Sequence, residues 1–229
     1  MTIVAARSVS SFFFEVVEDS LRLRGVEATD GATYYLVELL ADYAHPDEGA
    51  GETLERPLTL LLDEAVRETD PAKRFERLRS LGDGVLYGCG FFGDHFDARG
   101  IDPKYLHGLG ARAYGTASSM LRRGGDGTSP ARPGRARNQD GASPGAALGG
   151  GRKLEETGSD LFAELADNFA AFVAVVSDVA DTTVAMSTET ARGLLKVYER
   201  WLKTGSDRLA NALTSRGVMP TRGPKGVLQ

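Results

Sequence analysis

Residues 81–93 read LGDGVLYGCGFFG and carry five glycines among large apolar side chains. Just upstream, Asp70 and Pro71 indicate a helix start, because aspartate caps helix N-termini well and proline suits the first helical position. A helix that begins there runs into the glycine-rich stretch. Each glycine costs a helix about 1 kcal/mol relative to alanine. Five of them therefore indicate that another part of the backbone comes close to this helix.

The spacing of small residues indicates what comes close. Gly84 and Gly88 are four residues apart, as are Ala111 and Gly115 in a later segment, so each helix would present a seam of small side chains. Close packing of the two helices is the favoured interpretation. The alternative is a slot for a flat ligand or cofactor, bordered by Tyr87, Phe91 and Phe92. A phosphate-binding loop fits poorly, because the stretch lacks the preceding strand and the lysine that such loops use.

Composition and charge restrict the class of protein. With 229 residues, 41% of them hydrophobic, the chain is long enough to bury a full core. The net charge of −5 argues against attraction of the whole molecule to nucleic acid. The single cysteine, Cys89, excludes an internal disulfide and favours a reducing compartment. Because we find neither a signal-peptide pattern nor an apolar run near the ~20 residues of a membrane span, we expect a soluble cytoplasmic protein.

Positive charge is concentrated in one segment. Residues 122–153 hold seven basic and two acidic side chains, so the rest of the chain carries a net charge of −10. Between positions 124 and 152, Leu148 is the only large apolar residue among many Gly, Pro, Ser and Ala residues. Such a segment buries too little surface to offset its conformational entropy. We therefore predict a disordered, basic Gly/Pro/Arg-rich linker over residues 124–153.

Apolar side chains recur at helical spacing through nearly all of the remaining chain, and no segment alternates as a half-buried strand does. We expect helices over residues 8–24, 30–43, 58–68, 71 onward, 103–123, 159–181, 188–201 and 207–216. Gly25 is a plausible C-terminal cap of the first, and Ser187 a candidate N-cap of the seventh. The sequence thus predicts an all-α protein, a single bundle of about eight helices interrupted by the linker.

We expect one domain rather than two. Residues 1–123 would form its N-terminal helical part, and residues 154–219 would supply C-terminal helices that pack on the same bundle. Residues 220–229 would form a tail. Both flanks of the linker are helical, so the linker would join two halves of one bundle.

Asp83 is the most informative polar residue, because a carboxylate between two glycines on an apolar helix is costly to bury without hydrogen bonds. We expect it to bond Tyr105, Tyr114 or backbone groups of a neighbouring helix as a structural anchor. Contact with a ligand is the alternative. A binding site, if the chain has one, is predicted around Asp83, Tyr87, His95 and Tyr105.

The sequence shows little assembled chemistry. Its histidines are His45, His95 and His107. Neither His95 nor His107 has a carboxylate three residues before it, which argues against a di-metal carboxylate site. Cys89 lies in an apolar run and is interpreted as a small buried side chain rather than a nucleophile. We predict no catalytic residue, no metal site and no cofactor.

A succession of short segments spans most of the chain outside the linker. They are residues 34–42 (YYLVELLAD), 81–83 (LGD) with 90–92 (GFF), 102–105 with 110–114, and 198–202 (YERWL). In this succession the chain resembles an uncharacterised family of bacterial all-helical proteins. The resemblance implies no activity, so it assigns no catalytic residue.

These observations favour a non-enzymatic cytoplasmic regulatory or adaptor protein that acts on another protein through helical contacts. The alternative is a helical small-molecule-binding protein or enzyme with a pocket near the glycine-rich helix. Nucleic-acid binding through the basic linker is the weaker hypothesis, because the linker has no aromatic residue for base stacking. A clustered polar cavity would favour a small-molecule binder or enzyme, and a closed, dry core with an exposed apolar patch would favour an adaptor.

Overall fold

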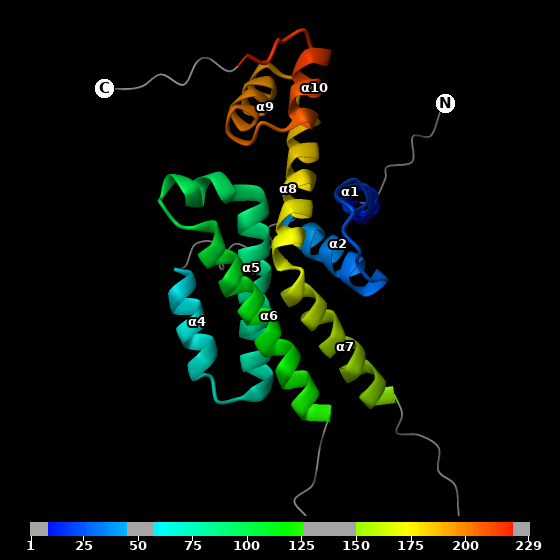
Figure 1. Ribbon diagram of the computed structural model, residues 1–229, viewed down its shortest axis with the longest axis vertical. Coiled ribbons are helices and arrows are strands. Elements are labelled where there is room, and N and C mark those ends of the chain that lie inside the picture. Colours follow the sequence, from blue (N-terminus) through cyan, green and yellow to red (C-terminus); the bar gives the residue numbers. More distant parts are fainter. Residues whose placement is uncertain (1–8, 45–56, 126–149, 222–229) are drawn as a thin grey trace, which may run out of the picture.

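The computed structural model describes residues 9–44, 57–125 and 150–221, which form nine helices and no strand (Figure 1). The helices are α1 (Val9–Arg24), α2 (Asp30–Ala44), α4 (Leu58–Arg67), α5 (Pro71–Ala98), α6 (Pro103–Gly125), α7 (Gly150–Asp167), α8 (Phe169–Ala185), α9 (Ala191–Thr204) and α10 (Asp207–Ser215). The all-α prediction is therefore confirmed. Among the described helices, none has the length and apolar character that crossing a membrane requires.

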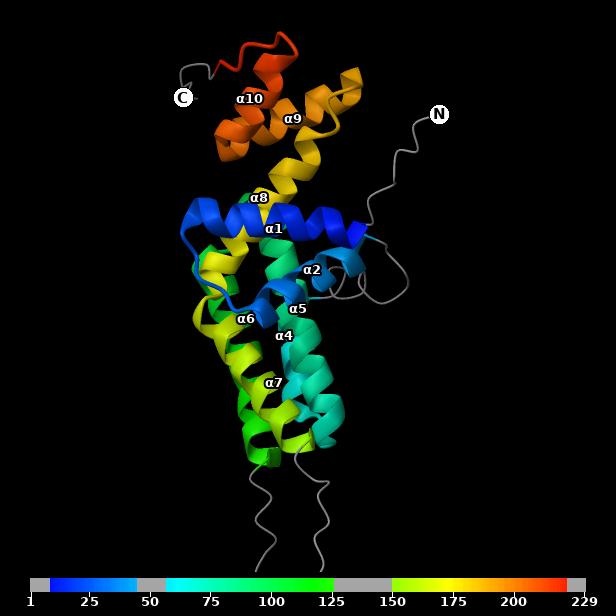
Figure 2. The same ribbon diagram turned by 90° about the vertical axis from the view of Figure 1, so that its right-hand side faces the viewer.

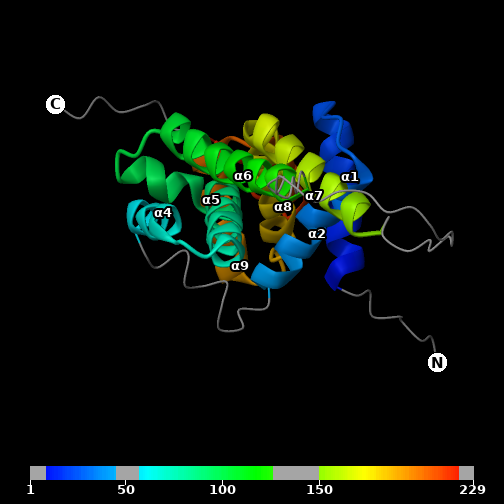
Figure 3. The ribbon, with the colours of Figure 1, turned by 90° about the horizontal axis from the view of Figure 1, so that it is seen from below.

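Helix α5 is the central helix of the molecule. Helices α2, α4, α6 and α8 all contact it, and α7 packs against α6 (Figure 3). Helix α1 lies across α2 and α8, while α9 and α10 lie together at the end of α8 (Figure 2). The molecule is consequently elongated, with α4, α5, α6 and α7 extending away from the end that carries α9 and α10.

The predicted linker connects two neighbouring helices. Helix α6 ends at Gly125 and α7 begins at Gly150, side by side at one end of the molecule (Figure 2). The first and last residues of the predicted linker thus belong to helices, while residues 126–149 lie outside the described residues. Helices α7 and α8 contact α6, α2, α5 and α1, all of which precede the linker.

The prediction of one continuous helix over residues 159–181 is wrong. The chain bends at Asn168, whose backbone angles (φ −103°, ψ 18°) leave helical geometry, and α8 starts at the next residue. The bend sets the Phe169 ring against Gly110 and 5.9 Å from the Tyr114 ring. Long-range packing of this aromatic side chain coincides with the break, which the apolar periodicity of the segment did not reveal.

Helix ends were predicted with mixed success. Asp70 caps α5 by accepting hydrogen bonds from two backbone N–H groups of the first turn, as expected. Gly25 follows α1 with φ +63°, a conformation that favours glycine. The N-cap of α9, however, is Thr190, whose hydroxyl accepts a hydrogen bond from the Gly193 N–H at 3.0 Å. Ser187 lies in the turn before it, and its carbonyl fills the space where a side chain at Gly193 would stand.

Apolar side chains form two clusters. The large cluster contains buried residues of every described helix from α1 to α8. The second belongs to α9 and α10, with Val197, Trp201, Leu209 and Leu213 at its centre. Side chains from the end of α8 pack against this second cluster, so α8 links the two.

Three buried glycines allow close approach between helices. A Cβ atom at Gly82 would lie 2.5 Å from the Tyr114 ring of α6, and one at Gly90 would overlap Val176 of α8. A Cβ atom at Gly110 would overlap the Phe169 ring. Close packing therefore occurs at Gly82, Gly90 and Gly110, where the approaching groups are chiefly side chains. The predicted seam of α6 does not face α5 at Gly115, where a Cβ atom would meet Ala166 of α7.

Two glycines of α6 give a matched test of this packing. We expect Gly110→Ala to lower the free energy of unfolding by about 1–3 kcal/mol, because its methyl group overlaps Phe169. Gly108→Ala should raise it by about 0.4–1 kcal/mol, because a Cβ there meets open space and alanine restricts the unfolded chain. Urea unfolding of both variants measures the difference. Equal effects at the two positions would contradict the packing at Gly110.

Candidate functional site

Asp83 joins three helices. Its Oδ1 accepts hydrogen bonds from the Tyr35 hydroxyl of α2 at 2.5 Å and from the Tyr114 hydroxyl of α6 at 2.7 Å. Its Oδ2 lies 3.6 Å from Nε of Arg79, one turn earlier on α5. The expected bond to Tyr114 is confirmed. The expected alternative, Tyr105, is wrong, because that side chain is 52% exposed on the surface of α6 and Tyr35 takes its place.

Burial keeps the protons of this network on the tyrosines. The pKa of Asp83 is raised, because burial and the nearby Asp42 outweigh the hydrogen bonds from Tyr35 and Tyr114 and the charge of Arg79, which lower it. Burial and the neighbouring Asp83 charge raise the pKa of both tyrosines well above the ordinary value. Both hydroxyl groups therefore remain donors at neutral pH and satisfy the Asp83 oxygen, which would otherwise be costly to bury.

The outer side of this network forms a cleft of about 380 Å³, which we call the tyrosine cleft. The polar and aromatic side chains that line it are Tyr34, Tyr35, Glu38, Asp42, Tyr43, Arg79 and Asp83. Glu38 and Asp42 are exposed and lie one turn apart on α2. The Arg79 guanidinium lies 6.0 Å from the centre of the Tyr35 ring, so the cleft already seats one cation over an aromatic face.

An aromatic stack supports the cleft. Tyr43 stacks on Tyr87 with ring centres 4.2 Å apart, and Tyr87 stacks on Phe91 at 4.5 Å. Burial raises the pKa of Tyr87, which does not itself line the cleft. Tyr87 therefore positions Tyr43 from the side and does not face the open space.

The four predicted site residues do not meet in one pocket. Asp83 lines the tyrosine cleft and Tyr87 lies beside it, whereas His95 and Tyr105 are exposed elsewhere. His95 follows Asp83 by twelve residues, about 18 Å along a helix. Tyr35 and Arg79, which also line the tyrosine cleft, were not among the predicted site residues. The i, i+4, i+8 spacing of Tyr34, Glu38 and Asp42 was the signal that could have indicated this polar face of α2.

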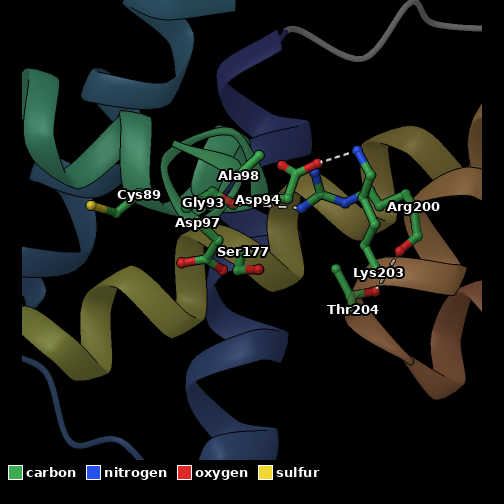
Figure 4. Close-up of a pocket in the computed structure, with 10 residues that line it drawn as sticks. Cys89, Gly93, Asp94, Asp97, Ala98, Ser177, Arg200, Lys203 and Thr204 are labelled. Carbon is green, nitrogen blue, oxygen red and sulfur yellow. Dashed lines mark hydrogen bonds and ion pairs between the residues drawn. The ribbon is translucent and has the colours of Figure 1, made fainter. Parts of the chain in front are cut away.

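A second cleft, of about 510 Å³, lies between α5, α8 and α9 (Figure 4). We call it the α5–α9 cleft. Its lining residues are Cys89, Gly90, Gly93, Asp94, Asp97, Ala98, Ser177, Arg200, Lys203 and Thr204. Its two sides carry opposite charge, since the carboxylates belong to α5 and the cations to α9.

Arg200 connects α9 to a bend in α5. At Phe92 the backbone leaves helical geometry (φ −127°, ψ 24°). The Arg200 guanidinium donates to the Phe91 carbonyl oxygen at 2.9 Å and more weakly to that of Gly90 at 3.5 Å. Its Nε donates to Oδ1 of Asp181, which is 4% exposed, at 2.5 Å. A buried ion pair therefore holds the cation that satisfies the bend.

Lys203 and Asp94 form an exposed ion pair across the same cleft, with Nζ 2.6 Å from Oδ2 (Figure 4). Although burial opposes ionisation, the hydrogen bond and charge of Lys203 and the charge of Arg200 lower the pKa of Asp94. The carboxylate is therefore ionised at neutral pH.

Cys89 does not have the environment of a nucleophile. Burial and the nearby Asp97 charge raise the pKa of the thiol to about 12, so it is protonated at neutral pH. Within the described residues, no group of three or more His, Cys, Asp or Glu side chains is arranged to hold a metal ion. His45 lies outside the described residues.

Comparison of the chain with protein-family models, curated proteins and solved structures found no match. The resemblance to a family of bacterial helical proteins therefore stays a prediction. Function is inferred from the geometry of the two clefts.

The adjacent residues Tyr34 and Tyr35 provide a test of the Asp83 network. We expect Tyr35→Phe to lower the free energy of unfolding by about 1.5–3 kcal/mol, because it removes a hydrogen bond to a buried charged group. Tyr34→Phe should change it by less than about 0.5 kcal/mol, because the Tyr34 side chain is 59% exposed. Chemical unfolding measures both variants. Equal stabilities would show that Tyr35 does not hold Asp83.

Proposed function

We propose that this protein is a non-enzymatic cytoplasmic adaptor or regulatory protein that binds a partner protein through the exposed face of α2. A basic side chain of the partner, arginine above all, enters the tyrosine cleft. The observation that carries the proposal is an open cleft lined by three acidic side chains and three tyrosines, in which the Arg79 guanidinium lies over the Tyr35 ring.

Charge supports a cationic occupant. Glu38 and Asp42 are like charges one turn apart on α2, an arrangement that destabilises a helix when nothing compensates it. After burial, which is the main cause, Asp42 also raises the pKa of Asp83, and both residues line the same cleft. Arg79 supplies one positive charge among the three carboxylates that line the cleft. A second cation would reduce the remaining repulsion.

Size and aromatic character support a single side chain. The volume of about 380 Å³ lies at the lower end of the range for ligand sites, roughly 300–1,000 Å³. Tyr34 and Tyr43 both line the cleft, and a guanidinium binds tyrosine ring faces favourably. An extended partner segment would also reach the neighbouring α1, where the Phe14 ring packs 5.5 Å from that of Tyr34.

The second candidate function is a small-molecule-binding protein or enzyme with a pocket beside the glycine-rich helix. The α5–α9 cleft favours it, because its charged residues gather in a cavity of about 510 Å³, the clustered polar cavity expected of a small-molecule binder.

A peptide titration tests the adaptor proposal. The probe is a short peptide of glycine and serine with one central arginine, added to the full-length ¹⁵N-labelled protein. We expect saturable shifts of α2 resonances that weaken as salt is added, because the contact is between exposed charges. Glu38→Gln/Asp42→Asn should weaken binding about tenfold, since two exposed charge contacts contribute about 1–2 kcal/mol together.

Two controls make this experiment specific. A peptide with citrulline in place of arginine keeps the shape but loses the charge, and it should not bind. The variant Glu18→Gln/Glu189→Gln removes the same charge from exposed positions outside the cleft and should bind as the parent does. Equal binding of the arginine and citrulline peptides, or equal weakening in both charge variants, would contradict the proposal.

A further inference from the structure

The α5–α9 cleft has negative side chains on one side and positive side chains on the other, a pattern that suits a molecule carrying both a positive and a negative charge. Asp94 and Asp97 approach from the end of α5, while Arg200 and Lys203 approach from α9 (Figure 4). The tyrosine cleft shares none of these residues, so this inference is independent of the proposed partner. We propose that the α5–α9 cleft binds a small zwitterion of the α-amino-acid type.

The carboxylate of the proposed ligand would bind Arg200 and Lys203 of α9. A guanidinium has five N–H donors. In Arg200, three of these N–H donors bind Asp181 and the two carbonyl oxygens at the bend in α5. Two remain without a hydrogen bond among the described residues. Because the pair with Asp181 fixes the guanidinium, these donors are already oriented when a carboxylate arrives.

The ammonium group of the proposed ligand would bind Asp94 and Asp97 of α5. Asp97 forms no ion pair with any described residue, and like Asp94 it lies near the C-terminal end of the helix. Negative side chains are unfavourable there, because the helix dipole already places partial negative charge at that end. An ammonium group between Asp94 and Asp97 would relieve this accumulation of negative charge.

Entry of the ligand exchanges one ion pair for two. The present Lys203–Asp94 pair is exposed, with 60% and 37% of the two side chains accessible, so separating it costs little. A zwitterion then gives its carboxylate to Lys203 and Arg200 and its ammonium to Asp94 and Asp97. A ligand with a single charge would leave one member of the separated pair without a partner, and the cleft therefore selects against it.

The rest of the cleft leaves room for a side chain. Its uncharged lining consists of small groups, namely Cys89, Gly90, Gly93 and Ala98, with the hydroxyl groups of Ser177 and Thr204. The Val176 side chain occupies the space that a Cβ atom at Gly90 would need, so α5 and α8 pack closely at this edge of the cleft. The volume exceeds that of a carboxylate and an ammonium alone.

Binding of free amino acids to the full-length protein tests the proposal. The probes are the free proteinogenic L-amino acids at millimolar concentration, followed by the N-acetyl and the amide derivative of the tightest one, each measured by NMR titration. We expect at least one amino acid to bind saturably. Both of its derivatives should bind at least about tenfold more weakly, because each lacks one of the two charges.

Variants locate the site. Lys203→Met and Asp97→Asn should each weaken binding about tenfold, whereas Lys196→Met, an exposed lysine of α9 outside the cleft, should leave it unchanged. Circular dichroism during heating shows whether each variant folds as the parent does. Failure of every amino acid to bind, equal binding of a derivative, or an equal effect of Lys196→Met would overturn the proposal. None of these outcomes bears on the arginine peptide, whose site is separate.

Discussion

A carboxylate buried beside a glycine determines how the centre of this protein is assembled. Gly82 has no side chain, so the Tyr114 ring of α6 can lie directly on α5, and its hydroxyl then reaches Asp83. The buried carboxylate requires hydrogen bonds, and Tyr35 supplies the second one from α2. This hydrogen bond ties α2, which also packs against α1 and α7, to α5 and α6. The tyrosine cleft exists because α2 is held there with Glu38 and Asp42 on its open side.

A second polar junction holds the C-terminal helices. Asp181 and Arg200 form a buried pair, and the guanidinium also satisfies carbonyl oxygens where α5 bends. Buried ion pairs contribute little net stability, but removing one partner leaves an uncompensated charge in the interior. The pair joins α9 to α8, and the contacts of the same guanidinium with Phe91 and Gly90 join α9 to α5. That placement brings Lys203 opposite Asp94 and creates the α5–α9 cleft.

Local features of the fold could be predicted from the sequence, whereas the site residues depend on contacts between distant segments. Helical periodicity and the Asp70 cap are short-range signals, and the structure confirms them. Hydrogen bonds of Asp83 to a neighbouring helix could be predicted, because a lone carboxylate in an apolar helix needs partners. Its partner Tyr35 lies 48 residues away, and no local pattern selects it over Tyr105. The contact of Arg200 with Phe91 spans 109 residues and depends on a bend that the sequence did not indicate.

The central claim is that Tyr35 and Tyr114 act on the same oxygen of Asp83. A double-mutant cycle with Tyr35→Phe, Tyr114→Phe and the double variant, measured by urea unfolding, tests it most directly. If both hydroxyl groups donate to Oδ1, the two losses should be coupled by about 0.5 kcal/mol or more. Losses that add to within about 0.3 kcal/mol would show that the two tyrosines act independently, and Asp83 would not be the group that joins the three helices.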